Sequence, residues 1–168
     1  MADPVFVESR TEMEELLRQE PWGCLGVCTE DGRPYIVPMN HAYVGGKILF
    51  HCALEGKKLD CIRANPNVCY TVARQPGTVQ PHPGGSPCHV DSDSVICMGE
   101  ARIVEDLKER ADVLNRFNRA FRPDAKDQSP ERVAGCAAVE ITIREMTGRH
   151  ESAQKRILWR YVPKAGKD

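Results

Sequence analysis

Hydrophobic and polar residues alternate along most of the chain, in short runs separated by turn-forming residues. The runs that predict β-strands are Trp22–Thr29, Arg33–Val44, Lys47–Cys52, Val68–Ala73, Asp93–Glu105, Ala137–Glu145 and Ile157–Val162. Asp31-Gly32 and Gly45-Gly46 stand between successive runs, which is typical of β-hairpins. Pro34 and Pro38 predict that their strand is bulged or lies at a sheet edge, because proline cannot donate to a ladder.

Other segments repeat their apolar residues at the spacing of an amphipathic helix. Thr11–Glu20 opens with a Thr-x-x-Glu capping box, Leu54–Asn65 ends before a proline, and a third helix follows Asp106 as its cap. The Pro- and Gly-rich stretch Arg74–Asp93 predicts a long loop with a functional role. Strands that run mostly antiparallel, with helices inserted between them, favour an α+β fold whose sheet curls into a barrel.

Length and charge limit the classes of protein. The 168 residues fit a single domain, taken as 1–168, and the net charge of −1 is unlike the basic surface of a nucleic-acid binder. No apolar run approaches the ~20 residues that span a bilayer. The start of the chain lacks the pattern of a secretory signal, so we expect a cytoplasmic protein with neither nucleic-acid nor membrane partners.

The eight cysteines are the unusual feature of the composition. Their spacing lacks the paired Cys-x2-Cys pattern of zinc sites, and a chain of this size needs no disulfides to fold. Most lie in apolar runs, which predicts buried, reduced thiols and no metal site. The compact cluster of Cys88, His89 and Asp91 is the one arrangement left open as a ligand site.

Lys57 and Lys58 stand at the predicted start of a helix, directly after a strand that ends at His51, Cys52 and Ala53. Unpaired N–H groups and a partial positive charge at a helix start, together with two ammonium groups, form an anion site of phosphate size. A solvated pair of surface lysines is the alternative, and the two residues alone do not decide between them.

The context of these lysines resembles a known family. The order R-P-Y-x-V-P-x-N, a hairpin, then L-F-H-x-A-x-x-G-x-K-x-x-x-x-x-x-N-P-x-V, is similar to the split-barrel FMN-binding superfamily that includes pyridoxamine 5′-phosphate oxidase. The chain most resembles its single-domain nitroimidazole-resistance (Nim-type) members, and the likeness continues through the segments 94–102, 139–148 and 154–160. It implies an antiparallel split β-barrel of six or seven strands with peripheral helices.

The resemblance also implies a homodimer with FMN at each subunit interface. Lys57 and Lys58 would hold the phosphate, and Ser94, Arg156 and Trp159 would come from the second subunit. The residues expected beside the isoalloxazine ring and ribityl chain are Tyr35, Val37, Pro38, Met39, Asn40, His51, Cys52 and Ala53.

Two departures from the vitamin-B6 oxidases limit what is carried over. Tyr35 and Lys57 stand where those enzymes have arginines, and lysine offers a point charge in place of the bidentate guanidinium fork. Their C-terminal Arg-x-His motif is also absent, so oxidation of vitamin B6 is not expected.

His51 is the candidate catalytic residue, because an imidazole beside the flavin can hydrogen-bond the ring edge or stabilise its anionic reduced form. His41 is expected to face the same cleft, whereas His150, like His82 and His89, is expected to face solvent. Trp22 and Trp159 are expected in the core or at an interface.

The sequence holds no recognisable catalytic triad or paired catalytic carboxylates, so any chemistry would be that of the cofactor. We expect a flavoprotein, nitroreductase-like, that takes electrons from a donor such as NAD(P)H and passes them to a small molecule. Two alternatives stay open. One is a flavin carrier or sensor without turnover, and the other is a haem-binding split barrel with His51, His41 or the Cys88-His89 pair as axial ligand.

Overall fold

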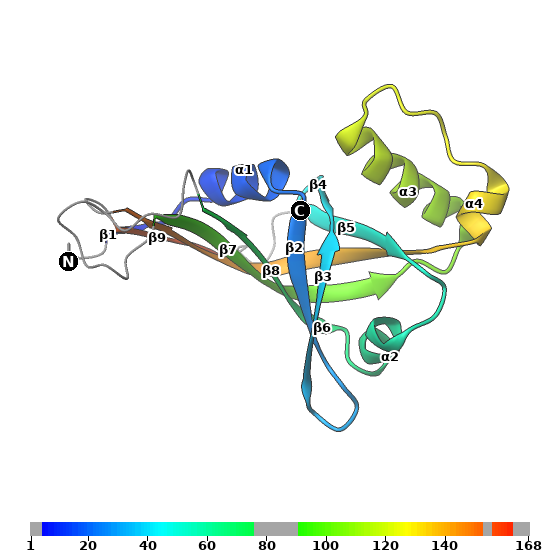
Figure 1. Cartoon of the computed structure of the whole chain (residues 1–168), viewed down its shortest axis with the longest axis horizontal. Coiled ribbons are helices and arrows are strands. Elements are labelled where there is room, and N and C mark those ends of the chain that lie inside the picture. The colour runs from blue at the N-terminus through cyan, green and yellow to red at the C-terminus, as the bar shows by residue number, and fades with distance from the viewer. Residues whose placement is uncertain (1–4, 76–90, 153–155, 163–168) are drawn as a thin grey trace.

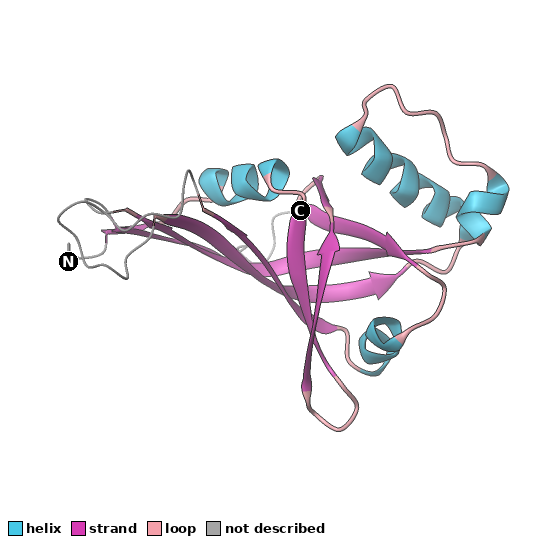
Figure 2. Ribbon diagram, in the orientation of Figure 1, coloured by secondary structure: helices cyan, strands magenta, loops and turns pink. Residues whose placement is uncertain are grey.

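A single large sheet organises the fold (Figures 1 and 2). The computed structural model describes residues 5–75, 91–152 and 156–162. Within them the elements are β1 (Val5–Val7), α1 (Thr11–Gln19), β2 (Trp22–Cys28), β3 (Pro34–Asn40), β4 (Ala42–Val44), β5 (Lys47–Cys52), α2 (Lys57–Ala64), β6 (Asn67–Arg74), β7 (Ser92–Ile103), α3 (Leu107–Phe121), α4 (Pro130–Ala134), β8 (Ala137–Glu151) and β9 (Arg156–Tyr161).

The strands pair in the order β1-β9-β8-β7-β6-β2-β3, and β5 joins β8 to β4. All pairs are antiparallel except β1 with β9. One edge of the long strand β8 is shared, because residues 137–142 pair with β5 and residues 146–151 pair with β9. The sheet therefore divides into a curled half beside β5 and an extended arm that ends at β9 and β1 (Figure 1).

Two apolar clusters lie on opposite faces of the curled sheet. The inner cluster fills the curl and includes the fully buried Phe50 and Tyr70, and α1 adds Met13, Leu16 and Leu17. The second cluster joins Leu49 and neighbouring sheet residues to Val113, Leu114 and Phe117 of α3 and Val133 of α4. The helices lie at the periphery of the sheet, as expected for an α+β split barrel (Figure 2).

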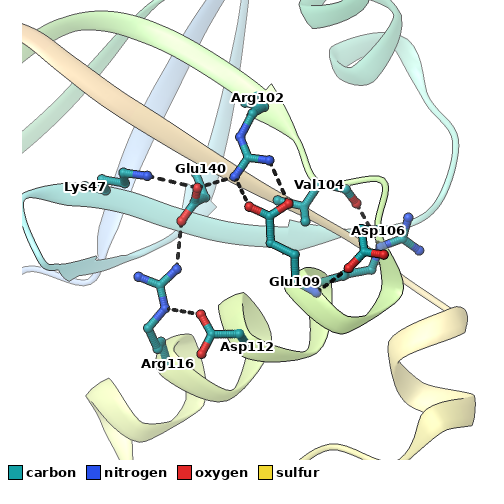
Figure 3. A network of polar contacts seen from close by, with 9 residues as sticks. Lys47, Arg102, Val104, Asp106, Glu109, Asp112, Arg116 and Glu140 are labelled. Carbon is teal, nitrogen blue, oxygen red and sulfur yellow. Dashed lines mark hydrogen bonds and ion pairs between the residues drawn. The ribbon is translucent and has the colours of Figure 1, made fainter.

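A buried carboxylate ties α3 to the sheet (Figure 3). Glu140 of β8 is 3% exposed and accepts hydrogen bonds from Lys47 Nζ at 3.1 Å, Arg102 Nη2 at 2.6 Å and Arg116 Nη2 at 2.7 Å. Burial alone would raise the pKa of Glu140, but these hydrogen bonds outweigh burial and lower it to about 2. Since the three cations come from β5, β7 and α3, one side chain fixes the relative positions of four elements.

The predicted elements are largely confirmed, with three differences. The structure has nine strands in its described residues in place of six or seven. The segment Arg33–Val44 divides into β3 and β4 at the buried His41, and a short strand, β1, pairs with β9. The capping box of α1 was wrong. Arg10 is the residue before the helix and has no side-chain cap, while Glu14 accepts a hydrogen bond from Tyr43 Oη at 2.5 Å.

Several smaller predictions are settled as well. β3 lies at the end of the strand order, as its prolines predict, and the side chain of Asp106 caps α3 by accepting from Glu109 N. Most of the predicted loop, with His82, Cys88 and His89, lies outside the described residues. None of the helices in the described segments is long and apolar enough to cross a membrane.

The cysteines are free, as predicted, at all seven positions that the structure describes. The prediction that most are buried is wrong for the single chain, because only Cys61 and Cys97 are buried. Cys24 and Cys69 face away from the core, Cys28 and Cys52 are the last residues of β2 and β5, and Cys136 lies between α4 and β8. The described residues contain no group of three or more His, Cys, Asp or Glu side chains that could hold a metal ion.

Candidate functional site

The start of α2 brings together the donor groups that predicted an anion site. Gly56 precedes the helix with φ of 138°, a conformation that favours glycine, and its carbonyl accepts from Leu59 N at 2.8 Å and from Asp60 N. The first N–H groups of a helix have no acceptor within it, and no described side chain accepts from those of Lys57 and Lys58. Two N–H groups and two ammonium groups therefore stand at the same helix start.

Tyr35 of β3 lies beside this helix start. The Lys57 ammonium is 4.5 Å from the centre of the Tyr35 ring, a cation–π contact that joins β3 to α2. Along β3, Val37 is half-buried and Met39 is buried, whereas Pro38 and Asn40 are exposed. The structure thus places Tyr35 beside Lys57 at the start of α2. The other residues predicted to line the flavin from this segment, Val37, Pro38, Met39 and Asn40, belong to the same edge strand.

Cys52 and His51 lie on opposite faces of β5. Cys52 packs against the inner core, and burial raises the pKa of its thiol, an effect that the nearby Lys58 charge partly offsets. The His51 ring instead meets Phe117 of α3 edge-on, with centroids 4.9 Å apart. Burial, reinforced by the positive charge of Arg132, lowers the pKa of His51. Ala53, the next residue, is exposed. The catalytic role of His51 stays a prediction.

The residues expected from a second subunit lie elsewhere on the chain. Ser94 stands in β7 opposite Ala73, while Arg156 and Trp159 belong to β9 in the extended arm. Figure 1 shows β9 and α2 at different ends of the sheet. A single chain therefore does not bring Arg156 and Trp159 to the lysines of α2.

Two histidine predictions are wrong. His41 does not share a cleft with His51. It is fully buried, with Nε2 3.0 Å from Leu17 O and Nδ1 3.0 Å from Tyr70 Oη, and the pocket that it borders is not lined by His51. Burial lowers the pKa of His41 to about 4, so the ring is neutral. His150 does not simply face solvent, since Nδ1 lies 2.7 Å from Asp93 Oδ1. The sequence signal for this pair was weak, because Asp93 and His150 become neighbours only through the β7–β8 register.

The sheet face that points away from the core along β3, β2, β6 and β7 is apolar and uncovered in the single chain. Ile36 is 65% exposed, Met98 48% and Ile96 44%. A pocket of about 400 Å³ opens between Ile36, Cys69 and Met98. We call this surface the outer face; its members are Trp22, Cys24, Cys28, Pro34, Ile36, Pro38, Cys69, Thr71, Ile96 and Met98. Trp22, expected in a core or interface, is 63% exposed here.

The fold of this chain is similar to that of several solved structures. The solved structure of a candidate 5-nitroimidazole antibiotic resistance protein from Bacteroides thetaiotaomicron has a TM-score of 0.73 and 27% identity, over 84% of each chain. An FAD- and haem-binding protein from Mycobacterium smegmatis has a TM-score of 0.70 and 16% identity, over 96% of this chain and 75% of that one. At 16% identity, the likeness shows the fold alone.

Sequence comparison agrees with the structural likeness. An uncharacterised protein of Rhizobium meliloti is 35% identical over 69 residues, which is 41% of this chain and 44%, less than half, of that relative. The profile of the pyridoxamine 5′-phosphate oxidase family matches residues 9–150, from the start of α1 almost to the end of β8. The chain therefore belongs to the pyridoxamine 5′-phosphate oxidase family.

Proposed function

We propose that the chain is an FMN-binding oxidoreductase that acts as a homodimer on a small electron acceptor of the nitroaromatic class. The observation that carries the proposal is the start of α2, where Gly56 leaves two backbone N–H groups free beside Lys57 and Lys58. Membership of the family and the likeness to the Bacteroides protein support the same conclusion.

The donor set fits a phosphate monoester. Backbone N–H groups at a helix start and ammonium groups are both ligands of phosphate, and the helix dipole adds a favourable potential. In this arrangement Lys57 and Lys58 bind the phosphate, and Tyr35 holds Lys57 in place. A flavin bound here would supply the electron-transfer chemistry, whereas the protein binds it, orients it and excludes water.

The outer face supports the homodimer. Monomeric proteins rarely expose a contiguous apolar surface that runs across four neighbouring strands. A second copy on this face would cover Ile36, Ile96 and Met98, and it would bring residues of another chain towards the α2 end. That geometry is the reason to expect Ser94, Arg156 and Trp159 from the partner, since one chain holds Arg156 and Trp159 far from the lysines (Figure 1).

His51 is proposed as the residue that tunes the reaction. Its lowered pKa makes the imidazole neutral at pH 7, so it is able to accept a hydrogen bond at one nitrogen and donate at the other. His41 is poorly suited as a haem ligand, because both of its ring nitrogens already have hydrogen-bond partners.

The first experiment is to identify the cofactor of the purified protein. We expect a flavin absorbance spectrum, release of FMN on denaturation, and bleaching by NAD(P)H followed by recovery with a nitroaromatic acceptor. Release of FAD would overturn the choice of FMN, and a Soret band would favour the haem alternative. Flavin binding without turnover above that of free flavin would indicate a carrier or sensor.

The second experiment tests the phosphate site. Lys57→Ala/Lys58→Ala should weaken FMN binding by about tenfold or more per lost charged contact, because a hydrogen bond to a charged group contributes about 1.5–3 kcal/mol. Binding of riboflavin, which lacks the phosphate, should change little. Lys108→Ala, an exposed lysine on α3, is the matched control. Equal loss of FMN and riboflavin affinity would refute the assignment of the phosphate to α2.

A further inference from the structure

A carboxylate–histidine pair lies in the arm, apart from the start of α2. Asp93 is 9% exposed and accepts from Arg74 Nη2 at 2.8 Å, while its other oxygen lies 2.7 Å from Nδ1 of His150. Burial alone would raise the pKa of Asp93, but hydrogen bonds from Arg74 and His150 outweigh it, so the group is an ionised acceptor. Nδ1 of His150 therefore carries a proton.

The hydrogen bond between His150 Nδ1 and Asp93 determines whether Nε2, the other ring nitrogen, can accept a hydrogen bond. In the neutral imidazole a proton on Nδ1 leaves a lone pair on Nε2. Within the described residues, Nε2 has no hydrogen-bond partner. Asp93 thus orients the ring and leaves a single acceptor available to a ligand.

Trp159 forms an aromatic wall beside this acceptor. It stands opposite Gly148 on β8, and a Cβ at Gly148 would lie 2.9 Å from Trp159 Cε3 and 2.8 Å from Met13 Cγ. The absence of that atom lets the indole lie close over β8. The ring centres of Trp159 and His150 are 6.3 Å apart, with the planes tilted by 45°. A flat ligand beside Trp159 is therefore close to the His150 ring.

These groups line a cavity of about 770 Å³ between α1 and the β7–β8–β9 arm, which we call the α1 pocket. Arg74 Nη1 donates to Gln19 Oε1 at 2.7 Å and so links the floor of the pocket to α1. The remaining lining is Val7, Thr11, Glu12, Glu15, Leu16 and Ile157. Apolar side chains thus come from the sheet and the inner side of α1, and carboxylates from its outer side.

The charges of the lining select the ligand. The lining holds three carboxylates, Glu12, Glu15 and Asp93, and one guanidinium, that of Arg74, which pairs with Asp93. Arg18 lies 3.5 Å from Glu15 but is not part of the lining. The lining is therefore negative on balance, which repels an anion and attracts a cation. A cation is also favoured at the face of an indole. When the only ring proton of His150 is the one on Nδ1, beside Asp93, Nε2 is an acceptor and requires a donor. A ligand that suits the carboxylates, the indole face and His150 Nε2 together is a flat ring that carries a positive charge and an N–H group.

We propose that the α1 pocket is a second ligand site, for a small planar aromatic cation that lies against Trp159 and donates a hydrogen bond to His150 Nε2. The residues of this pocket come from α1 and the arm and not from α2. Trp159 is also expected beside the flavin of the partner subunit, so the test has to separate binding at the α1 pocket from binding at the flavin. Arg74 and Asp93 are positioning residues in this arrangement, since they act through His150.

Three probes of the same shape and different charge test the proposal on the protein as purified. Benzamidinium is a planar aromatic cation with N–H donors, benzamide is its neutral counterpart and benzoate its anionic one. Calorimetry gives the affinities, and the indole N–H signals in NMR spectra report the site, because the chain has only two tryptophans. We expect benzamidinium to shift the Trp159 signal and not that of Trp22, and to bind at least tenfold more tightly than benzamide.

Substitutions identify the contacts. His150→Ala should weaken benzamidinium binding about tenfold, with partial recovery in His150→Gln, because its amide oxygen can also accept. Glu15→Gln should weaken binding about twofold to fivefold, as expected for an exposed charge, and Glu105→Gln, on the loop before α3, should leave it unchanged. Thermal unfolding of each variant checks its fold.

The results that would overturn the proposal are specific. They are an unshifted Trp159 signal at millimolar benzamidinium, benzamide or benzoate binding as tightly as the cation, or full affinity in a folded His150→Ala variant. A benzamidinium-induced change in the spectrum of bound flavin that is equally large in His150→Ala would place the probe at the cofactor and refute the α1 pocket.

Discussion

Replacing Glu140 by glutamine should lower stability in a way that depends on pH. The carboxylate is buried and accepts hydrogen bonds from three cations, and its pKa is lowered from 4.5 to about 2. A shift of this size corresponds to about 3 kcal/mol of unfolding free energy at pH 7. Because Lys47 and Arg102 are partly exposed and can be rehydrated, we expect a measured loss of about 2–3 kcal/mol in Glu140→Gln.

The sign of the pH dependence follows from the lowered pKa. The contribution is fully present above the unfolded-state pKa of 4.5 and is lost as pH falls towards 2. At pH 3 it should have fallen to about 1.4 kcal/mol, so the wild type and Glu140→Gln should differ less there than at pH 7.

Urea unfolding at pH 7 and pH 3, at one fixed protein concentration, measures both differences. Glu109→Gln is the matched control, because this exposed carboxylate shares Arg102 with Glu140 and its loss is expected to lower stability much less. A difference between wild type and Glu140→Gln that is below 1 kcal/mol at pH 7, or equal at both pH values, would refute the reasoning.

Three further predictions concern other parts of the chain. Tyr70→Phe should cost about 1–2 kcal/mol in urea unfolding, because it leaves His41 Nδ1 and Met39 O without the Tyr70 hydroxyl in a buried site; an unchanged midpoint would show that neither bond contributes. Ile36→Lys should shift the protein from dimer to monomer in sedimentation experiments, and an unaltered dimer would exclude the outer face as the interface. The pKa of His51, measured from the ring protons in NMR spectra, should lie below 6.5, since burial disfavours the charged form of the ring. The stability of the fold should therefore fall as pH drops below 6.5. A measured pKa at or above 6.5 would contradict the position of His51 against Phe117.

Local patterns in the sequence predicted most of the elements. Alternation identified the long strands, Gly45-Gly46 the hairpin between β4 and β5, and Asp106 the start of α3. These features depend on residues that are close together in the chain, so the local sequence is enough to predict them. The capping box of α1 failed because the helix already includes Thr11, and Glu14 bonds the side chains of Tyr43, Arg10 and Arg18 instead.

Features that depend on distant segments were not predictable in this way. His41 was expected to share the cleft of His51 because it follows Asn40, but its two partners, Leu17 and Tyr70, come from other elements. The Asp93–His150 pair requires the register of β7 with β8. The lysine pair at α2 was found because a helix start and its glycine are local features.

The shared edge of β8 has a consequence for synthesis of the chain. Strand β5 is made early, yet its antiparallel partner, residues 137–142, follows roughly ninety residues later. Until the ribosome has released that segment, β5, which includes Phe50, has only the short strand β4 beside it. The curled half of the sheet therefore closes only after residues 137–142 have been made. Premature termination before β8 should leave an aggregation-prone fragment that depends on chaperones, not a smaller folded domain.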